Sequence, residues 1–167
     1  MKIIRIAIIT VSDKGSKGER EDKSGQVIKE MIDEIGGDII DYKIIPDERA
    51  IIKEELEIIA DSDKADLILT TGGTGFAKRD ITPEATIEVI EKEVPGIPEK
   101  MRMDTIQITP MAALSRAKAG IRGKTLIVNL PGSPKAVREC LESIIDILPH
   151  GIDILRGNVT EHKHNHE

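Results

Sequence analysis

The chain has 167 residues, a length typical of a single domain that buries about 70% of the surface exposed by its unfolded chain. Its formal net charge is −6, and it contains no tryptophan, one tyrosine and one phenylalanine. Nucleic-acid-binding domains usually combine a basic face with stacking aromatic side chains, so the composition argues against this class. The apolar run over residues 3–9 is too short for a signal peptide or a membrane span, and we therefore expect a cytoplasmic protein.

Predicted strands and helices alternate through the first half of the chain. Hydrophobic periodicity predicts a strand over residues 3–11, a helix over 24–35, a strand over 38–45 and a helix over 48–60. The last of these helices is expected to bury Ile51, Ile52, Leu56 and Ile59. Asp47 lies directly before it and is suited to be its N-cap.

The second half continues the alternation. A buried strand is predicted over residues 67–71, helices over 83–91 and 99–105, an antiparallel edge segment near 119–121, a buried strand over 124–130, and helices over 133–148 and around 152–155. This pattern predicts an α/β fold with three layers, in which a mostly parallel, doubly wound sheet lies between two layers of helices. We expect one domain over residues 1–158. The tail over 159–167 holds three histidines, which can bind metals opportunistically, but a disordered terminus is the preferred interpretation.

The stretch from Asp66 to Ala85 carries the clearest sign of a ligand site. A buried strand ends at Thr71, and three glycines follow within four residues, which allows positive φ angles and a close approach of a ligand to the backbone. Asp80 lies just beyond, and Thr82-Pro83 is typical of an N-cap followed by proline at the first helical position. Ligands of open α/β sheets bind at such strand-to-helix connections. The alternative is a tight connection with incidental glycines.

Neither common phosphate-loop motif fits this stretch. The dinucleotide fingerprint requires a third glycine where Lys78 stands, and the Walker loop requires a lysine where Phe76 follows Gly75. The sequence therefore predicts a glycine loop of another design.

Three further polar loops are predicted at the same edge of the sheet. Ser12-Asp13 follows the first strand, Asp47 the second, and Pro131-Gly132-Ser133 the last buried strand. Ser133 is a predicted N-cap, and the backbone amides of its helix, with Lys135 beside them, could bind an anion. Each loop also has a purely structural interpretation as a turn or a helix cap. Cys140, on the apolar face of the same helix, is interpreted as core packing rather than as a nucleophile.

Several separated segments resemble the molybdenum-cofactor biosynthesis proteins of the MogA/MoaB type. The segments are Thr70-Thr71-Gly72-Gly73-Thr74-Gly75, Arg79-Asp80-Ile81-Thr82-Pro83-Glu84-Ala85, Ser115-Arg116 and Leu130-Pro131-Gly132-Ser133-Pro134-Lys135-Ala136, together with Thr10-Val11-Ser12-Asp13 and Ile45-Pro46-Asp47-Glu48. The resemblance covers about residues 4–157 and is nearest to the molybdopterin adenylyltransferase branch.

This resemblance implies transfer of AMP from Mg-ATP to the terminal phosphate of molybdopterin, with release of pyrophosphate. It assigns catalysis and Mg²⁺ binding to Asp47 and Asp80, which we expect at the ends of neighbouring strands. It assigns substrate and nucleotide binding to Ser12, Asp13, Thr71, Gly72, Gly73, Thr74, Gly75, Ser115, Pro131, Gly132 and Ser133. Lys135 joins this set as the cation beside the helix that Ser133 opens. It further implies a homotrimer and hand-over of the adenylated pterin to a metal-insertase protein.

The residues present suit this chemistry. The attacking group would be a phosphate oxygen, which is already ionised at neutral pH, so no serine or histidine nucleophile is needed. Attack on a phosphorus atom depends on alignment and charge neutralisation, and Mg²⁺ takes oxygen ligands such as the two aspartates. Two alternatives remain open, namely a MoaB-like paralog with weak or no adenylylation and a non-catalytic molybdopterin carrier or scaffold. The cofactor could carry molybdenum or tungsten.

Overall fold

The computed structural model describes residues 2–158, so the predicted tail over 159–167 lies outside the described residues. The strands are β1 (Ile4–Val11), β2 (Gly37–Ile45), β3 (Leu67–Thr71), β4 (Lys92–Glu93), β5 (Ala119–Arg122) and β6 (Thr125–Leu130). The helices are α1 (Asp13–Ser16), α2 (Lys23–Met31), α3 (Arg49–Asp61), α4 (Thr82–Val89), α5 (Gly96–Thr105), α6 (Pro134–Ile144) and α7 (Leu148–Leu155), with 3₁₀ turns η1 (Ile32–Ile35) and η2 (Pro110–Leu114). None of the helices within residues 2–158 has the length and apolar character needed to cross a membrane.

One six-stranded sheet has the order β2-β1-β3-β6-β5-β4. The first four strands in this order are parallel to one another. Strand β5 is antiparallel to both of its neighbours, β6 and β4. The predicted edge segment at residues 119–121 is indeed antiparallel, but it is not at the edge, because the two-residue strand β4 pairs outside it. No hydrophobic periodicity marks β4, since Lys92 and Glu93 are both charged and exposed.

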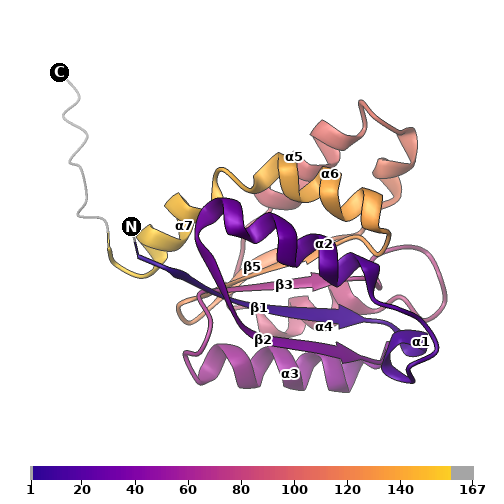
Figure 1. The fold of residues 1–167 in the computed structure, drawn as a ribbon, viewed down its shortest axis with the longest axis horizontal. Helices are drawn as coiled ribbons and strands as arrows, with labels where there is room; N and C mark the ends of the chain where they lie inside the picture. The colour runs from indigo at the N-terminus through magenta and orange to yellow at the C-terminus, as the bar shows by residue number, and fades with distance from the viewer. Residues whose placement is uncertain (1, 159–167) are drawn as a thin grey trace.

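Helices cover both faces of this sheet, which confirms the predicted three-layer α/β fold (Figure 1). Successive residues of β1 face opposite layers: Ile6 and Ile8 pack with α2, α5, α6 and α7, and Ala7 and Ile9 pack with α3 and α4. All four of these side chains are fully buried. The central strands are therefore continuous apolar runs, as expected for a parallel sheet between two helical layers.

Helix α3 buries the residues predicted for its apolar face, with one exception. Ile52, Leu56 and Ile59 are buried as expected, but Ile51 is 37% exposed because it lies at the border of the apolar stripe. The carboxyl ends of β1, β2, β3 and β6 all point to one edge of the sheet, and the loops at that edge form the site described below.

Candidate active site

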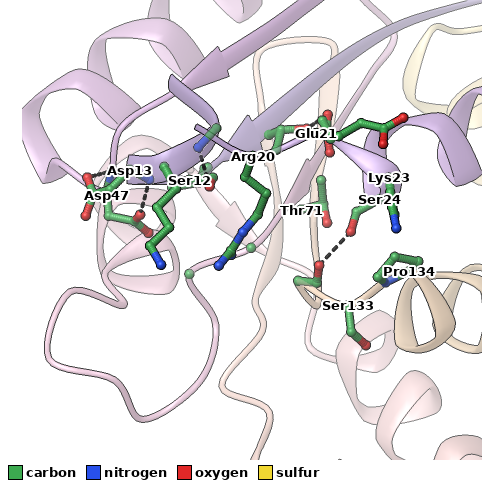
Figure 2. Close-up of a pocket in the computed structure, with 18 of the residues that line it drawn as sticks. Ser12, Asp13, Arg20, Glu21, Lys23, Ser24, Asp47, Thr71, Ser133 and Pro134 are labelled. Carbon is green, nitrogen blue, oxygen red and sulfur yellow. Dashed lines mark hydrogen bonds between the residues drawn. The ribbon is translucent and has the colours of Figure 1, made fainter. Parts of the chain in front are cut away.

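A cleft of about 890 Å³ lies at the carboxyl edge of the sheet (Figure 2). Its walls include residues predicted from four separate loops, namely Ser12, Asp13, Asp47, Thr71, Gly72, Gly73, Asp80, Gly132 and Ser133. Seven further lining residues with polar side chains were not predicted from the sequence: Thr10, Lys14, Arg20, Glu21, Asp22, Lys23 and Ser24. The structure therefore brings most of the predicted site residues together and adds three cationic side chains to them.

The glycine loop approaches its neighbours so closely that side chains are excluded. Gly72 has φ +97° and Gly73 has φ +70°, both in the left-handed region. A Cβ on Gly72 would lie 2.4 Å from the carbonyl oxygen of Val11, and one on Gly73 would lie 2.3 Å from Oγ1 of Thr82. The glycines are thus required by the packing of β1 against β3 and by the start of α4, not only by a ligand.

The predicted N-cap role of Thr82 is wrong, because its side chain does not cap α4. Its hydroxyl donates a hydrogen bond to the Gly72 carbonyl at 2.9 Å, and its backbone N–H donates to the Gly73 carbonyl at 3.1 Å. The Thr82 side chain is fully buried, so these bonds tie the start of α4 to the glycine loop. Ile81 occupies the N-cap position and provides no side-chain cap.

Asp47 and Asp13 hold each other through a reciprocal pair of hydrogen bonds (Figure 2). The Asp13 N–H donates to Asp47 Oδ2 at 2.9 Å, and the Asp47 N–H donates to Asp13 Oδ1 at 3.0 Å. The predicted N-cap role of Asp47 is wrong, because Glu48 holds that position and makes no cap hydrogen bond. The Asp47 carboxylate is instead turned toward the loop that follows β1.

The charge state of Asp47 reflects its surroundings. Burial raises the pKa of its carboxyl above the ordinary value, and the charges of Asp13 and Asp80 raise it further, against a lowering by the Asp13 hydrogen bond. The pKa of Asp13 is lowered, chiefly by its hydrogen bonds from Arg79. The negative charges of Asp13 and Asp80 disfavour the ionisation of Asp47, and a site of this kind attracts a cation.

Asp80 reaches the same cleft by a longer route than expected. β1 lies between β2 and β3, so Asp47 and Asp80 do not follow neighbouring strands. The loop after β3 carries Asp80 across this gap, and its Oδ2 accepts a hydrogen bond from the Ala77 N–H at 3.0 Å. Both aspartates therefore line the same cleft despite the intervening strand, and the charge of Asp80 contributes to the raised pKa of Asp47.

The donor set in the cleft fits magnesium. Among residues 2–158, no group of three or more His, Cys, Asp and Glu side chains could hold a metal ion by itself. Two carboxylates that share one cleft match the usual mode of Mg²⁺, which is bound by one or two carboxylates together with phosphate oxygens and water.

Ser24 and Asp22 shape the opposite wall of the cleft. The Ser24 hydroxyl donates to the Gly132 carbonyl at 2.6 Å and ties α2 to the loop after β6 (Figure 2). Asp22 caps α2 by accepting from the Gly25 N–H at 2.9 Å, and it also accepts hydrogen bonds from the hydroxyls of Thr10 and Tyr42. An aspartate directly before the helical periodicity was a cap signal available in the sequence.

The remaining predicted residues line a second cleft of about 580 Å³. These are Thr74, Gly75, Ser115, Pro131 and Lys135. Apolar side chains from α5 and η2, among them Met101, Met111 and Leu114, form much of its surface. Four residues line both clefts, namely Gly73, Asp80, Gly132 and Ser133. The predicted site is therefore two adjoining compartments that meet at Asp80.

Helix α6 borders the second cleft. Ser133 is its N-cap, as predicted, and accepts a hydrogen bond from the Ala136 N–H at 3.2 Å. The Lys135 side chain is 85% exposed beside this helix start. Cys140 packs against the core and also lines the cleft, and burial raises the pKa of its thiol to about 11. A thiol with this pKa is protonated at neutral pH, which supports the packing interpretation.

Comparison with known proteins identifies the family. Residues 7–150 match the family described as "Probable molybdopterin binding domain". The chain belongs to this family. It is 47% identical over 160 residues to the molybdopterin adenylyltransferase of Helicobacter pylori strain J99, with 95% of this chain and 91% of the relative covered.

Solved structures of the family share the fold. The molybdopterin biosynthesis enzyme MoaB of Thermus thermophilus superposes with a TM-score of 0.88 at 51% identity, covering 92% of this chain and 97% of the other. The tungsten cofactor synthesizing protein MoaB of Pyrococcus furiosus gives a TM-score of 0.84 at 39% identity, covering 93% and 99%.

Proposed function

We propose that this chain is a molybdopterin adenylyltransferase, which transfers AMP from Mg-ATP to the terminal phosphate of molybdopterin and releases pyrophosphate. The observation that carries the proposal is the convergence of Asp47 and Asp80 on one cleft beside the glycine loop, in a chain 47% identical to a molybdopterin adenylyltransferase. The adenylyltransferase domain is proposed to span residues 1–158, and the enzyme to work in the cytoplasm.

The chain's own groups perform orientation and charge neutralisation. A phosphate oxygen of molybdopterin attacks the α-phosphorus of ATP and pyrophosphate leaves, so no protein nucleophile takes part. Asp47 and Asp80 would hold a magnesium ion, which supplies positive charge to the phosphates when bound. Lys14, Arg20 and Lys23 surround the first cleft and attract the triphosphate.

The two clefts give each substrate its own compartment. ATP and molybdopterin each carry a heterocycle and a phosphate group, and Gly73, Asp80, Gly132 and Ser133 face both compartments. Placing the reacting phosphates at this junction aligns the attacking oxygen with the α-phosphorus, which is the main requirement of phosphoryl transfer. Backbone N–H groups at the α6 N-terminus lie beside the junction and suit phosphate oxygens.

Incubation with ATP, Mg²⁺ and molybdopterin tests the proposal through pyrophosphate release. Asp80→Asn should abolish turnover and leave molybdopterin binding nearly intact, and Asp47→Asn should act similarly but more mildly. Asp146→Asn, which makes the same charge change at an exposed position between α6 and α7, is the matched control and should keep the wild-type rate. Wild-type rates in both active-site variants would refute the assignment of the two aspartates.

A second candidate is a MoaB-like protein that binds molybdopterin without adenylylating it or carries it to a partner. The 51% identity to the MoaB of Thermus thermophilus favours keeping this candidate. Tight molybdopterin binding without pyrophosphate release from the wild-type chain would select it over the enzyme.

The assembly proposed is a homotrimer that hands the adenylated pterin to a metal-insertase protein. Apolar side chains exposed at the end of α5 and just after it support a subunit interface there, namely Met103, Ile106 and Ile108. Light scattering after size-exclusion chromatography checks the trimer, which predicts a mass near three times that of the 18.3 kDa chain.

A further inference from the structure

Over residues 76–79 the loop that carries Asp80 has no apolar anchor, and the nearest one is Ile81, which follows Asp80 directly and is half-buried against the core. Residues 76–79 are all exposed, and Phe76, the largest of them, is 72% exposed. A segment without buried side chains is positioned by its hydrogen bonds, and loops that lack them open easily. The location of the Asp80 carboxylate therefore depends in part on which groups bond the backbone of residues 74–80.

Arg116 supplies most of those bonds. Its backbone N–H donates to the Thr74 carbonyl at 3.0 Å, its Nε donates to the Gly75 carbonyl at 2.8 Å, and its Nη2 donates to the carbonyl of Asp80 itself at 3.0 Å. One residue thus binds both ends of the exposed segment. Arg79 gives the loop a further attachment, to Asp13 and Glu48, but its side chain is 53% exposed and such pairs contribute little.

Glu84 fixes the direction of the Arg116 guanidinium. Its Oε1 accepts from Nη1 of Arg116, and its position in the first turn of α4 holds it relative to the sheet. The guanidinium is a rigid planar fork with five N–H donors, so it can bond Glu84, Gly75 and Asp80 at once. A lysine at this position could not satisfy three acceptors in one plane.

We propose that Arg116 is a positioning residue for the adenylyl transfer, because it binds both ends of the loop between β3 and α4 and so sets where the Asp80 carboxylate lies in the cleft. The inference rests on the proposed function, in which Asp80 holds magnesium. Arg116 lines neither of the two clefts that meet at Asp80, so it acts through the loop rather than on the substrate.

Arg116→Ala, Arg116→Lys and the control Arg138→Ala test the proposal. Arg138 forms an ion pair with Glu30 on the surface of α6, so its removal makes the same charge change away from the loop. A displacement of about 1 Å in a catalytic group costs about 100-fold in rate, and we expect a loss in kcat of that order in both Arg116 variants. The KM for molybdopterin should stay within about threefold, since no substrate contact is removed, and the Mg²⁺ concentration for half-maximal rate should rise.

Two readouts separate positioning from a general loss of structure. Hydrogen exchange of the peptide covering residues 74–81 should accelerate in Arg116→Ala and not in Arg138→Ala, with circular dichroism unchanged. Added guanidinium ion should restore part of the kcat of Arg116→Ala and none of that of Asp80→Asn. If Arg116→Ala does not fold, Arg116→Lys is measured in the same two ways.

The outcomes are distinct from those that test the proposed function. A wild-type chain without turnover defeats the adenylyltransferase assignment, and hydrogen exchange still reports whether Arg116 holds the loop. An active wild type with unchanged kcat, Mg²⁺ dependence and loop exchange in both Arg116 variants overturns the positioning role.

Discussion

Replacing Gly72 by alanine tests whether the glycine loop is dictated by packing. Gly72 has φ +97°, and a Cβ there would lie 2.4 Å from the Val11 carbonyl oxygen, a backbone atom that cannot rotate away. Gly18→Ala is the matched control, because Gly18 has φ +74° and no heavy atom lies within 4 Å of the position that its Cβ would take. Both substitutions add the same methyl group to a left-handed residue, and only one of them adds a clash.

Two separate costs contribute to the expected loss of stability. An alanine in the left-handed region costs about 1–2 kcal/mol, and this cost applies to both variants. Forcing atoms into a closely packed site costs about 1–3 kcal/mol, and this cost applies only to Gly72→Ala. We therefore expect Gly72→Ala to lower the free energy of unfolding by about 2–5 kcal/mol, with the excess over Gly18→Ala equal to the clash.

Urea unfolding followed by far-UV circular dichroism measures both losses, since the chain has no tryptophan for fluorescence. A loss of about 1 kcal/mol lowers Tm by about 2–4 °C in a chain of this size. Gly72→Ala should also reduce turnover, because Thr82 bonds the Gly72 carbonyl and would move with it. Equal destabilisation by the two variants would show that β1 and the glycine loop do not approach as closely as the structure places them.

The raised pKa values of Asp47 and Cys140 lead to three further predictions. Asp47→Asn should raise Tm at neutral pH, because a raised pKa means that ionisation of Asp47 destabilises the folded state as pH rises above the ordinary carboxyl value. Thermal melts check this, and a fall in Tm would contradict it. In the pH profile of kcat/KM, the midpoint of the acid limb should lie above the ordinary carboxyl pKa, since protonation of Asp47 removes a proposed magnesium ligand. A midpoint at or below that value would argue against this role of Asp47. Iodoacetamide at mildly alkaline pH should alkylate Cys140 about 100-fold more slowly in the folded than in the guanidinium-unfolded chain, and equal rates would contradict its raised pKa.

The sequence was sufficient wherever the signal is local. Apolar runs predicted the buried strands, because a parallel sheet covered on both faces needs apolar side chains in both directions. Ser133 with Pro134 predicted the start of α6, because capping involves residues three apart. The charged strand β4 had no such signal and was missed, since it is joined to β5 by backbone hydrogen bonds that carry no hydrophobic pattern.

Long-range geometry governs the rest of the site. Asp47 looked like a helix cap, yet its partner is Asp13, 34 residues away, and nothing in either loop alone indicates that pairing. The strand order places β1 between β2 and β3, which precede Asp47 and Asp80. Asp80 nevertheless lines the same cleft as Asp47, because the loop after β3 carries it there.

The amino-acid pattern alone thus predicted glycine-rich and polar loops at the carboxyl edge of a parallel sheet, and the family resemblance proposed the phosphate and magnesium roles of their residues. The folded chain was needed to show that they form two compartments joined at Asp80, and that Arg116, 36 residues further along the chain, holds the loop between them. Side-chain type and periodicity are properties of neighbouring residues, whereas a cleft and a hydrogen bond between distant loops exist only after the strands have paired.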